Sequence, residues 1–419
     1  MRMNKIIVAA AVCLSCSIAS AATYTWDGGD GSSQAWSTDS NWAGDVGPVS
    51  ASDTRLLFDG ASNTGTTANK LANDVADPFL LNILEFSNSD NVAFVLGGSQ
   101  LQFVNDGSTG PLIKSTRQPS QAIYNPIEVG AGVTLKLQNT TYYIDFQGPI
   151  SGDGALLVDS NFGSGEFFMQ TANTFTGGVT YVSTTSNPSW RNLDIRHDQG
   201  LGAGDLNVQG GNINPYSATT NNRPGGVRFS GSNRTVSNDI NLLADSPLYA
   251  GNENGDTPTS DNVTLSGALD LDTYTAVLRG RGTGTYSGLI DGSAGGGIKK
   301  LGISSTWNLT GTMLFDIDGA TSSLIELDEG TLDISGLTID FAGALATLEQ
   351  YVLVDYATGG TLVKGSFNPF GSVANKPGGY AVFDDVVNSQ ILLIAVPTPG
   401  AGAMGIVLML GTAACRRRR

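Results

Sequence analysis

Between residues 77 and 345 the chain alternates apolar and polar residues over short runs, and turn-forming residues separate these runs. Alternation with a period of two is the pattern of a β-strand with one buried face, and Gly, Asn, Asp and Ser favour turns. No stretch of this region shows convincing 3.6-residue periodicity, which an amphipathic helix requires. We therefore expect many short strands. The clearest runs are 83–86, 93–96, 101–104 and 133–137.

Two strings recur farther along the chain with changes. The string 125–129 (Asn-Pro-Ile-Glu-Val) is echoed at 238–242 (Asn-Asp-Ile-Asn-Leu), and 146–154 is echoed at 286–292. The irregular separations indicate a degenerate repeat array with insertions. In such an array each strand pairs with its counterpart one coil away, and inward apolar side chains form a continuous core. We predict an all-β solenoid, with a β-sandwich array as the alternative.

The composition is rich in glycine and in acidic residues. Gly accounts for 55 of 419 residues, and the apolar content of 40% is sufficient for a core. Six basic residues lie in the two ends of the chain, which leaves 16 basic against 38 acidic residues between them. A surface with this charge repels nucleic acid, so we expect no nucleic-acid partner.

The first 21 residues have the pattern of a secretory signal peptide. A basic start precedes an apolar run over 6–18 and small residues at 19–21. We expect a signal peptidase to cleave between Ala21 and Ala22. Cysteine occurs only at 13, 16 and 415, so the segment between the two ends has no disulfide and no thiolate for catalysis or metal binding.

The C-terminal residues 396–419 combine three features in a fixed order. An apolar stretch over 401–415 follows a Pro-containing motif and precedes an arginine cluster. This stretch is short for a membrane span, but a bilayer can thin to accommodate it. The arginines would stay on the cytoplasmic side, which leaves the rest of the chain outside. The motif is Pro397, Thr398, Pro399 and Gly400, and the cluster is Arg416, Arg417, Arg418 and Arg419.

This order of parts resembles the PEP-CTERM sorting signal of bacterial envelope proteins. Thr398 stands where that family has Glu between the prolines. The resemblance implies a short transmembrane helix that anchors the chain transiently, cleavage near 397–400 by an exosortase-type processing enzyme, and delivery to the cell surface or extracellular matrix.

A second resemblance lies within the predicted solenoid. Residues 172–180 (Ala-Asn-Thr-Phe-Thr-Gly-Gly-Val-Thr) and 201–208 look like the two halves of the autotransporter-associated β-strand repeat. The Gly-x-Ile-x-Gly segments that begin at Gly148 and Gly288 resemble the strand that usually precedes it. In that family such repeats build right-handed parallel β-helices on exported proteins, which is the fold that the resemblance implies here.

Tryptophans are concentrated near the predicted start of the mature chain. Trp26, Trp36 and Trp42 lie close together in the sequence. We interpret 22–76 as an aromatic-rich N-terminal cap, because the first coil of a solenoid needs a cover. The alternative is a platform on which sugar rings stack, which would make these three indoles contact residues for an extracellular polysaccharide.

Few residues between the two ends suit catalysis or metal binding. His197 is the only histidine, and no nucleophile is identifiable beside the Arg-His-Asp string 196–198. The Asp pairs at 270/272 and 316/318 each share one face of a strand and could offer two carboxylates to calcium, although solvated turn acids also explain them. We expect no catalytic residue, no metal site and no cofactor.

Two functions from different classes remain open. We expect a non-catalytic exported cell-surface or extracellular-matrix protein, a scaffold or adhesin that presents a β-solenoid. The alternative is a β-helical polysaccharide lyase or glycoside hydrolase that uses paired carboxylates on the solenoid's face. The expected domains are a signal peptide (1–21), the cap (22–76), the solenoid (77–345), a closing β-strand segment (346–395) and the sorting tail (396–419).

Overall fold

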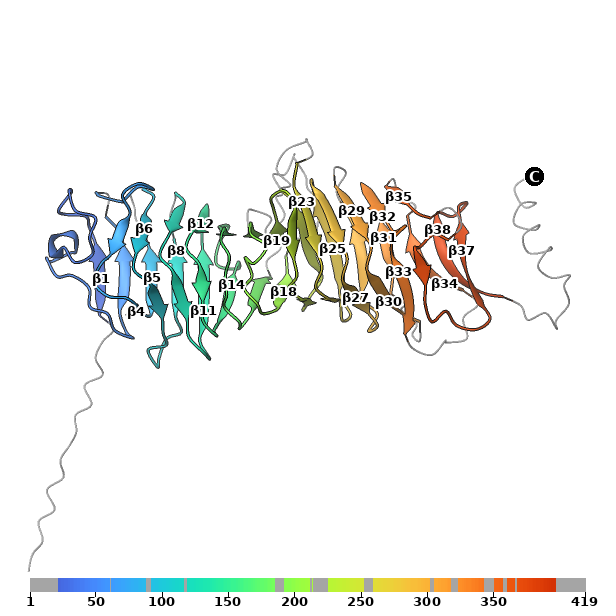
Figure 1. Cartoon of the computed structure of the whole chain (residues 1–419), viewed down its shortest axis with the longest axis horizontal. Helices are drawn as coiled ribbons and strands as arrows, with labels where there is room; N and C mark the ends of the chain where they lie inside the picture. The colour runs from blue at the N-terminus through green and yellow to red at the C-terminus, as the bar shows by residue number, and fades with distance from the viewer. Residues whose placement is uncertain are drawn as a thin grey trace, which may run out of the picture.

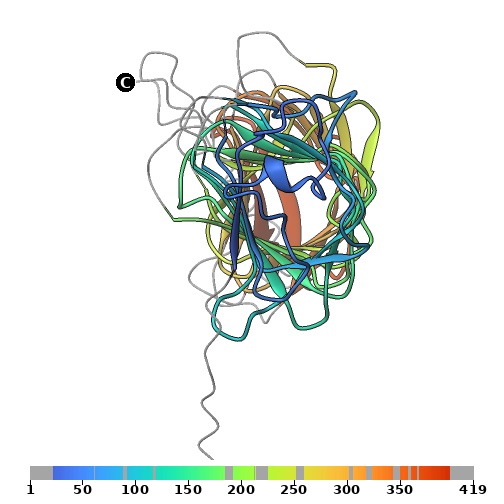
Figure 2. The same ribbon diagram turned by 90° about the vertical axis from the view of Figure 1, so that its left-hand side faces the viewer.

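The described part of the protein is a straight rod built from stacked β-strands. The computed structural model describes residues 22–396, apart from 61, 88–91, 117–118, 185–191, 212, 214–224, 252–258, 302–304, 318–322, 343–349, 357–359 and 366–367. The strands follow one another along a single axis from the N-terminal to the C-terminal end (Figure 1). Viewed from the N-terminal end, successive coils superimpose around that axis (Figure 2). The prediction of an all-β solenoid is confirmed, and the alternative of a β-sandwich array is wrong.

Four sheets run along the rod, and we call them sheets A to D. Sheet A contains, in spatial order, β1 (Thr23–Trp26), β2 (Arg55–Phe58), β5 (Ile83–Phe86), β8 (Leu112–Ser115), β11 (Thr134–Asn139), β14 (Ala155–Asp159), β16 (Val179–Ser183), β18 (Leu206–Gly210), β21 (Ile240–Leu242), β24 (Leu269–Asp270), β27 (Leu289–Gly292), β30 (Thr312–Asp316), β33 (Thr338–Ala342) and β36 (Ser372–Val373). Sheet B contains β3 (Leu71–Asn73), β6 (Val95–Gly98), β9 (Gln121–Ile123), β12 (Tyr143–Phe146), β15 (Glu166–Met169), β17 (Asn192–Ile195), β19 (Gly226–Phe229), β22 (Ser246–Ala250), β25 (Thr275–Gly280), β28 (Gly297–Lys300), β31 (Ile325–Leu327), β34 (Gln350–Asp355), β38 (Gln390–Ala395) and β37 (Tyr380–Asp385).

The two shorter sheets occupy the third side of the rod. Sheet C lies in the N-terminal half and contains β4 (Phe79–Leu81), β7 (Leu101–Phe103), β10 (Ile127–Val129) and β13 (Ile150–Ser151). Sheet D lies in the C-terminal half and contains β20 (Arg234–Val236), β23 (Asn262–Leu265), β26 (Thr283–Tyr286), β29 (Thr306–Leu309), β32 (Thr331–Asp333) and β35 (Thr361–Val363). The one helical turn among the described residues is η1 (Asp39–Asn41), and none of them forms a helix long and apolar enough to cross a membrane.

On the third side between β13 and β20 the described residues form no strand, and a side chain adds to the backbone bonds between coils, such as that from the N–H of Thr174 to the carbonyl of Ile150 at 2.8 Å. Asn173 accepts a hydrogen bond at Oδ1 from the backbone N–H of Ile150, 2.8 Å away, one coil earlier. Its Nδ2 donates to the carbonyl of Gly200, 2.6 Å away, in the following coil. One carboxamide therefore satisfies buried backbone groups on both neighbouring coils, which keeps the stack continuous between these two strands. Asn173 belongs to the segment that resembles the autotransporter-associated repeat.

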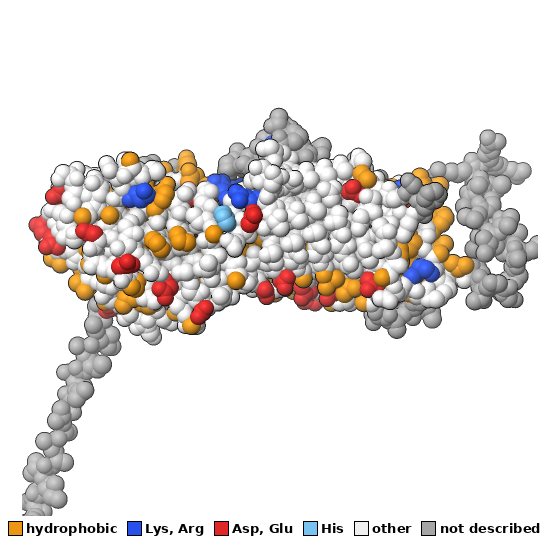
Figure 3. Space-filling view, viewed as in Figure 1, with side chains coloured by type: hydrophobic (Ala, Val, Ile, Leu, Met, Phe, Trp, Pro, Cys, Tyr) orange, Lys and Arg blue, Asp and Glu red, His pale blue; other side chains and the backbone are white. Residues whose placement is uncertain are grey.

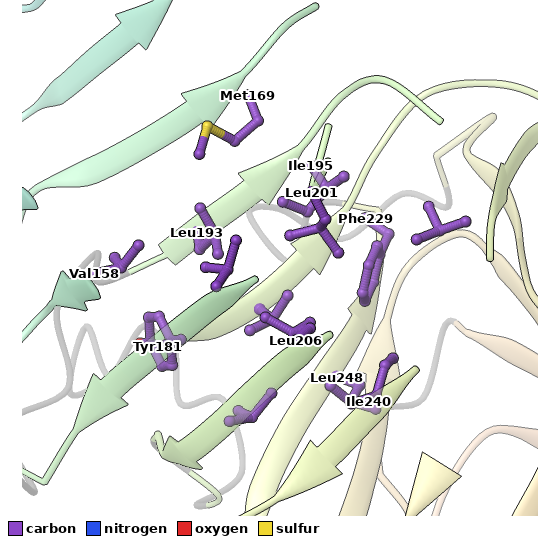
Figure 4. Packing of buried hydrophobic residues seen from close by; sticks show 14 of the residues in the cluster. Val158, Met169, Tyr181, Leu193, Ile195, Leu201, Leu206, Phe229, Ile240 and Leu248 are labelled. Atoms are coloured by element: carbon purple, nitrogen blue, oxygen red, sulfur yellow. The ribbon is translucent and has the colours of Figure 1, made fainter. Parts of the chain in front are cut away.

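Aliphatic side chains form uninterrupted columns inside the rod. The alternation in each strand turns every second side chain inward, and the parallel register stacks equivalent positions along the axis. Figure 4 shows this packing in the central coils, where side chains from both long sheets meet in the interior. One column on sheet A is Leu135, Leu156, Val179, Leu206, Ile240, Leu269, Ile290, Met313 and Ile339.

The recurring strings do not occupy equivalent sides of the coil. The string 125–129 forms β10 on sheet C, whereas its echo 238–242 forms β21 on sheet A. Both strings follow a corner where stacking is close: a Cβ added at Gly148 would lie 2.2 Å from the carbonyl oxygen of Asn125, and one at Gly267 would lie 2.2 Å from that of Asn238. The two strings therefore share the same type of close-stacked corner. This corner leads into sheet C in the N-terminal half and into sheet A in the C-terminal half.

The parallel stack extends beyond the expected solenoid at both ends. It begins inside the expected cap, because β1 pairs with β2 and β2 pairs with β5. It also continues into the expected closing segment, where β34 pairs with β31 and β36 pairs with β33. Among the described strands, only the last ones of sheet B reverse direction, since β38 is antiparallel to both β34 and β37.

Candidate functional site

The three predicted sugar-contact tryptophans lie inside the N-terminal cap. Trp26 and Trp36 are 0% exposed and Trp42 is 1% exposed. The rings of Trp26 and Trp42 meet edge to face with centroids 5.2 Å apart, and Trp42 Nε1 donates to the carbonyl of Trp36 at 2.8 Å. Sugar stacking needs an exposed ring face, so the interpretation of these indoles as a carbohydrate platform is wrong for this state. Their burial among Phe58 and one another fits the cap interpretation.

The residues predicted to direct sorting lie outside the described part of the chain. This holds for Ala21, for the motif 397–400 and for the arginines 416–419. Ala22 lies directly before β1, and its carbonyl accepts a hydrogen bond from the N–H of Arg55 at 2.9 Å. The expected signal peptide, transmembrane stretch and processing site therefore stay predictions.

The residues considered for catalysis or calcium binding lie in turns or at strand ends, except Asp318, which lies outside the described residues. Nδ1 of His197 accepts from the N–H of Gln199 at 3.1 Å, while Asp198 accepts from the N–H of Thr235 at 3.3 Å. The N–H of Asp272 donates to Asp270 Oδ1 at 2.9 Å, as turn acids do. Across the described ranges, no group of three or more His, Cys, Asp or Glu residues is placed to hold a metal ion.

A buried polar cluster that sequence reasoning missed lies on the outer face of sheet B. It spans β15, β17 and β19, whose residues are buried on both faces of the sheet. The space-filling view shows a few basic side chains and the histidine on the surface near the middle of the rod (Figure 3). We call the buried group on β15, β17 and β19 the central ionic cluster; it consists of Glu166, Asn192, Asp194, Arg196, Arg228 and Ser230.

Asp194 is the centre of the cluster. Its Oδ2 accepts hydrogen bonds from Arg228 Nη2 at 2.8 Å and from Arg196 Nε at 2.6 Å. Its Oδ1 accepts from the hydroxyl of Ser230 at 2.6 Å. Burial works to raise the pKa of Asp194, but the charge and hydrogen bonds of Arg228, with the charge of Arg196, hold this pKa below its ordinary value. Asp194 is therefore a buried, fully bonded carboxylate anion.

Glu166 lies one coil before Asp194 and shares the same guanidinium. Its Oε1 is 3.5 Å from Arg228 Nη1 and accepts a hydrogen bond from Asn192 Nδ2 at 2.6 Å. Here burial outweighs Arg228 and Asn192, so the pKa of Glu166 is raised above its ordinary value. Two carboxylates that contact one arginine thus have opposite pKa shifts.

An aromatic and acidic extension joins the cluster to β12. The guanidinium of Arg196 lies 3.6 Å from the ring centroid of Phe168, and Tyr143 stacks on that ring with centroids 4.4 Å apart. Asp145 pairs in register with Phe168 and accepts from Gln147 Nε2 at 2.7 Å. Burial raises the pKa of Asp145, and its buried Oδ1 has no hydrogen-bond partner among the residues that the structure describes.

Sequence reasoning missed the cluster because a linear reading aligns only one pair of its members, Asp194 and Arg196, which are two residues apart. Glu166 and Arg228 each stand as the one charged residue of an otherwise apolar strand in other coils. Asp194 pairs in register with Phe168 of the preceding coil and with Arg228 of the following coil, and these two coils differ in length. A charged residue within an otherwise apolar strand was the available signal, since such a residue needs a partner when it is buried.

The geometry of the cluster suits a clamp between coils better than an open reaction site. Opposite pKa shifts on neighbouring carboxylates are a feature of general acid and base pairs. A reacting group must also reach its substrate. The side chains of Asp194 and Glu166 are only 0% and 8% exposed, and both oxygens of Asp194 already accept hydrogen bonds from the protein. In this state the cluster ties three successive coils together.

Comparison of the chain with protein-family models, with curated proteins and with solved structures finds no match.

Proposed function

We propose that this chain is a non-catalytic, exported cell-surface or extracellular-matrix protein, a scaffold or adhesin that presents a β-solenoid. The observation that carries the non-catalytic part of this proposal is the central ionic cluster: its acids are engaged in contacts between coils and are not free to reach a substrate. A long stack with an uninterrupted core offers an extended surface of similar, shallow sites, and many weak contacts can sum to a useful avidity.

We also propose that the chain reaches this location through its two ends. A signal peptidase would remove 1–21, and the apolar stretch with its arginines would hold the chain in the membrane until an exosortase-type enzyme releases it. The excess of acidic residues gives a surface that repels nucleic acid, so we propose no nucleic-acid partner. The same charge suits a protein that must stay soluble outside the cell. An extracellular polysaccharide is the partner class that we propose for the surface of the rod, now without a role for the cap tryptophans.

Cell fractionation and a phenotype test this function together. Replacing the four arginines 416–419 with serine should change the fraction in which the chain is found, because a short apolar stretch orients poorly without them. Deleting the gene should reduce adhesion, aggregation or matrix retention of the cells while polysaccharide degradation is unchanged. An unaltered fraction for the serine variant would contradict the sorting proposal, and unaltered adhesion and retention would contradict the surface role.

A β-helical polysaccharide lyase or glycoside hydrolase is the second candidate, and one observation favours it. Glu166 has a raised pKa and Asp194 a lowered one, which is the pairing of a proton donor with an anion that glycosidases use. The purified chain would then release reducing or unsaturated sugars from an envelope polysaccharide, and Glu166→Gln would abolish that release. Release that survives this substitution would exclude Glu166 as the proton donor.

A further inference from the structure

The C-terminal end of sheet B has an edge strand with exposed apolar neighbours. β37 is the last strand of the sheet, and the described residues place no strand on its outer side. Phe383 within the strand is 40% exposed, and Val386 and Val387 in the following turn are 69% and 89% exposed. An edge of this kind presents backbone donors and acceptors to another strand.

The pairing of β37 with β38 determines which backbone groups point outward. The N–H of Val396 donates to the carbonyl of Gly379 at 2.6 Å, just before the ladder begins. Hydrogen-bonded pairs alternate along an antiparallel ladder, so Ala381, Phe383 and Asp385 direct their backbone groups toward β38. The backbone groups of Val382 and Asp384 consequently face away from the sheet.

We propose that β37 pairs with β37 of a second copy of this chain, antiparallel and about a two-fold axis at Val382. The outward groups of Val382 would bond to those of the partner's Val382, and sheet B would continue from one rod into the next. A two-fold contact of this kind closes on itself, because each copy uses the same surface. The product is a tail-to-tail dimer and not a filament.

The side chains around this axis are complementary in shape and polarity. The register places Phe383 opposite Ala381 of the partner subunit, in a closely spaced pair that favours apolar contact. The antiparallel arrangement also brings the exposed Val386 and Val387, in the turn after β37, toward the partner's segment before the strand, where the surroundings of Gly378 are open. Covering these two valines removes apolar surface from water.

Charges at the two ends of β37 are also complementary. Lys376 Nζ bonds to the carbonyl of Tyr380 at one end, and Asp385 lies at the other end, beside Asp384, whose carboxylate is already paired with Lys364 of the same chain. The antiparallel arrangement carries Lys376 to the acidic end of the partner's strand, and the contact repeats through the two-fold axis. The same charges oppose a parallel arrangement, which would bring like ends together.

This pairing of two chains goes beyond the proposed function. It rests on that function only for the stage at which the dimer forms, which is after release from the membrane. The described chain ends at Val396, which pairs with Gly379 at this same end of the rod. A chain still held in a membrane by its tail would turn this end toward the membrane. We therefore assign the dimer to the released protein, and its test in solution does not depend on whether the sorting proposal holds.

Disulfide trapping tests the register directly. In the full chain, with Cys13, Cys16 and Cys415 replaced by serine, Val382→Cys would bring two thiols together across the axis. Hydrogen-bonded antiparallel pairs have Cα atoms about 5.5 Å apart, within the range that a disulfide bridges. Mild oxidation should give a covalent dimer. The matched variant Asp385→Cys would place its thiols roughly 20 Å apart and should not form a dimer.

Light scattering on the chain without added cysteines provides the second readout. We expect a mass of two chains at micromolar concentration, and Phe383→Lys should shift the population to one chain. Phe162→Lys is the matched control, because Phe162 is 39% exposed and lies far from β37. A one-chain mass for the unmodified protein, growth beyond a dimer, or equal trapping at 382 and 385 would each overturn the proposal.

Discussion

The guanidinium of Arg228 bonds to the carboxylate of Asp194 in the preceding coil, with Nη2 2.8 Å from Oδ2, and both side chains are buried. The two residues are direct neighbours across the ladder between β17 and β19. A slip of one residue would turn one of them into the core, so the pair also defines the register of the central coils. Two unpaired charges inside the protein would cost far more than the pair.

Replacing Asp194 with alanine should destabilise the protein strongly. The substitution leaves Arg228 buried with only Glu166 as a directly contacting acid among the described residues, and breaking a buried ion pair costs about 3–5 kcal/mol. The free energy of unfolding in denaturant measures the loss. Glu326→Ala is the control, because the pair between Lys299 and Glu326 is 30% and 40% exposed and such pairs contribute at most about 1 kcal/mol. Similar losses for both variants would contradict the clamp.

Glu166 should make the folded state more stable in mild acid. Its folded pKa lies above the ordinary value of 4.5, mainly because of burial, so the folded state keeps a proton that the unfolded chain has lost. That contribution is present below 4.5 and is lost as the pH rises through the raised pKa. We expect the unfolding free energy of the wild type, relative to Glu166→Gln, to increase as the pH falls from about 7.5 to about 4.5.

Asp385 provides a control for the pH dependence of the unfolding free energy, because its pKa is shifted in the opposite direction to that of Glu166. Asp385 has a lowered pKa, chiefly because the side chain and backbone of Asn388 donate hydrogen bonds to it. Its contribution is present above the ordinary value of 3.8 and is lost as the pH falls through the lowered pKa. Relative to Asp385→Asn, the wild type should lose stability in acid. A pH-independent difference between wild type and Glu166→Gln would refute the assignment of a raised pKa.

Strand alternation predicted the short strands and the side chains that turn inward, and the recurring strings predicted that these strands stack as coils. Runs such as 133–137 place Leu135 and Leu137 on one face, and the structure stacks both on leucine or valine of the next coil. The assignment of these runs as β-strands needs only this local information. The burial of the three tryptophans also follows from a local feature, because their density near the start of the chain indicated a cover.

The register of the coils could not be predicted, because coil length varies. Leu269 aligns with Ile290 across a short coil, whereas Thr338 aligns with Ser372 across a much longer one. Insertions at the corners are tolerated since each coil contacts only its neighbours. Any feature that depends on alignment across coils was therefore hidden, including the contact between Asp194 and Arg228 and the change of side between β10 and β21.

Gly284 should not tolerate a side chain, because the indole of Trp307 lies against it in the next coil. A Cβ added at Gly284 would be 2.5 Å from Trp307 Cδ2 and Cε3. The indole is held in place, since its Nε1 donates to the carbonyl of Arg279 at 2.9 Å and the ring is 0% exposed. Gly284→Ala should therefore cost about 1–3 kcal/mol of unfolding free energy.

The control for Gly284 is a glycine with open space around it. Among the described residues, no atom lies within 4 Å of a Cβ added at Gly110, which does not have a positive φ. Gly110→Ala should leave stability unchanged or raise it by about 0.4–1 kcal/mol through the unfolded chain. Equal effects of the two substitutions would show that the indole can move away from Gly284.

Trp36 should stabilise the N-terminal coils locally. Its ring contacts Phe58 with centroids 5.9 Å apart and meets Phe79 edge to face at 5.6 Å, so it joins β2 of sheet A to β4, the first strand of sheet C. Trp36→Ala removes a fully buried ring, which costs about 3–5 kcal/mol. Each coil of a solenoid is stabilised only by its neighbours, so the loss should be confined to the cap and the first coils. Amide hydrogen exchange measures this: protection should fall in β2 and β4 and persist in β30. Loss of protection along the whole rod would mean that the solenoid unfolds as one unit, and unchanged protection in β2 would mean that the indole is not part of the cap.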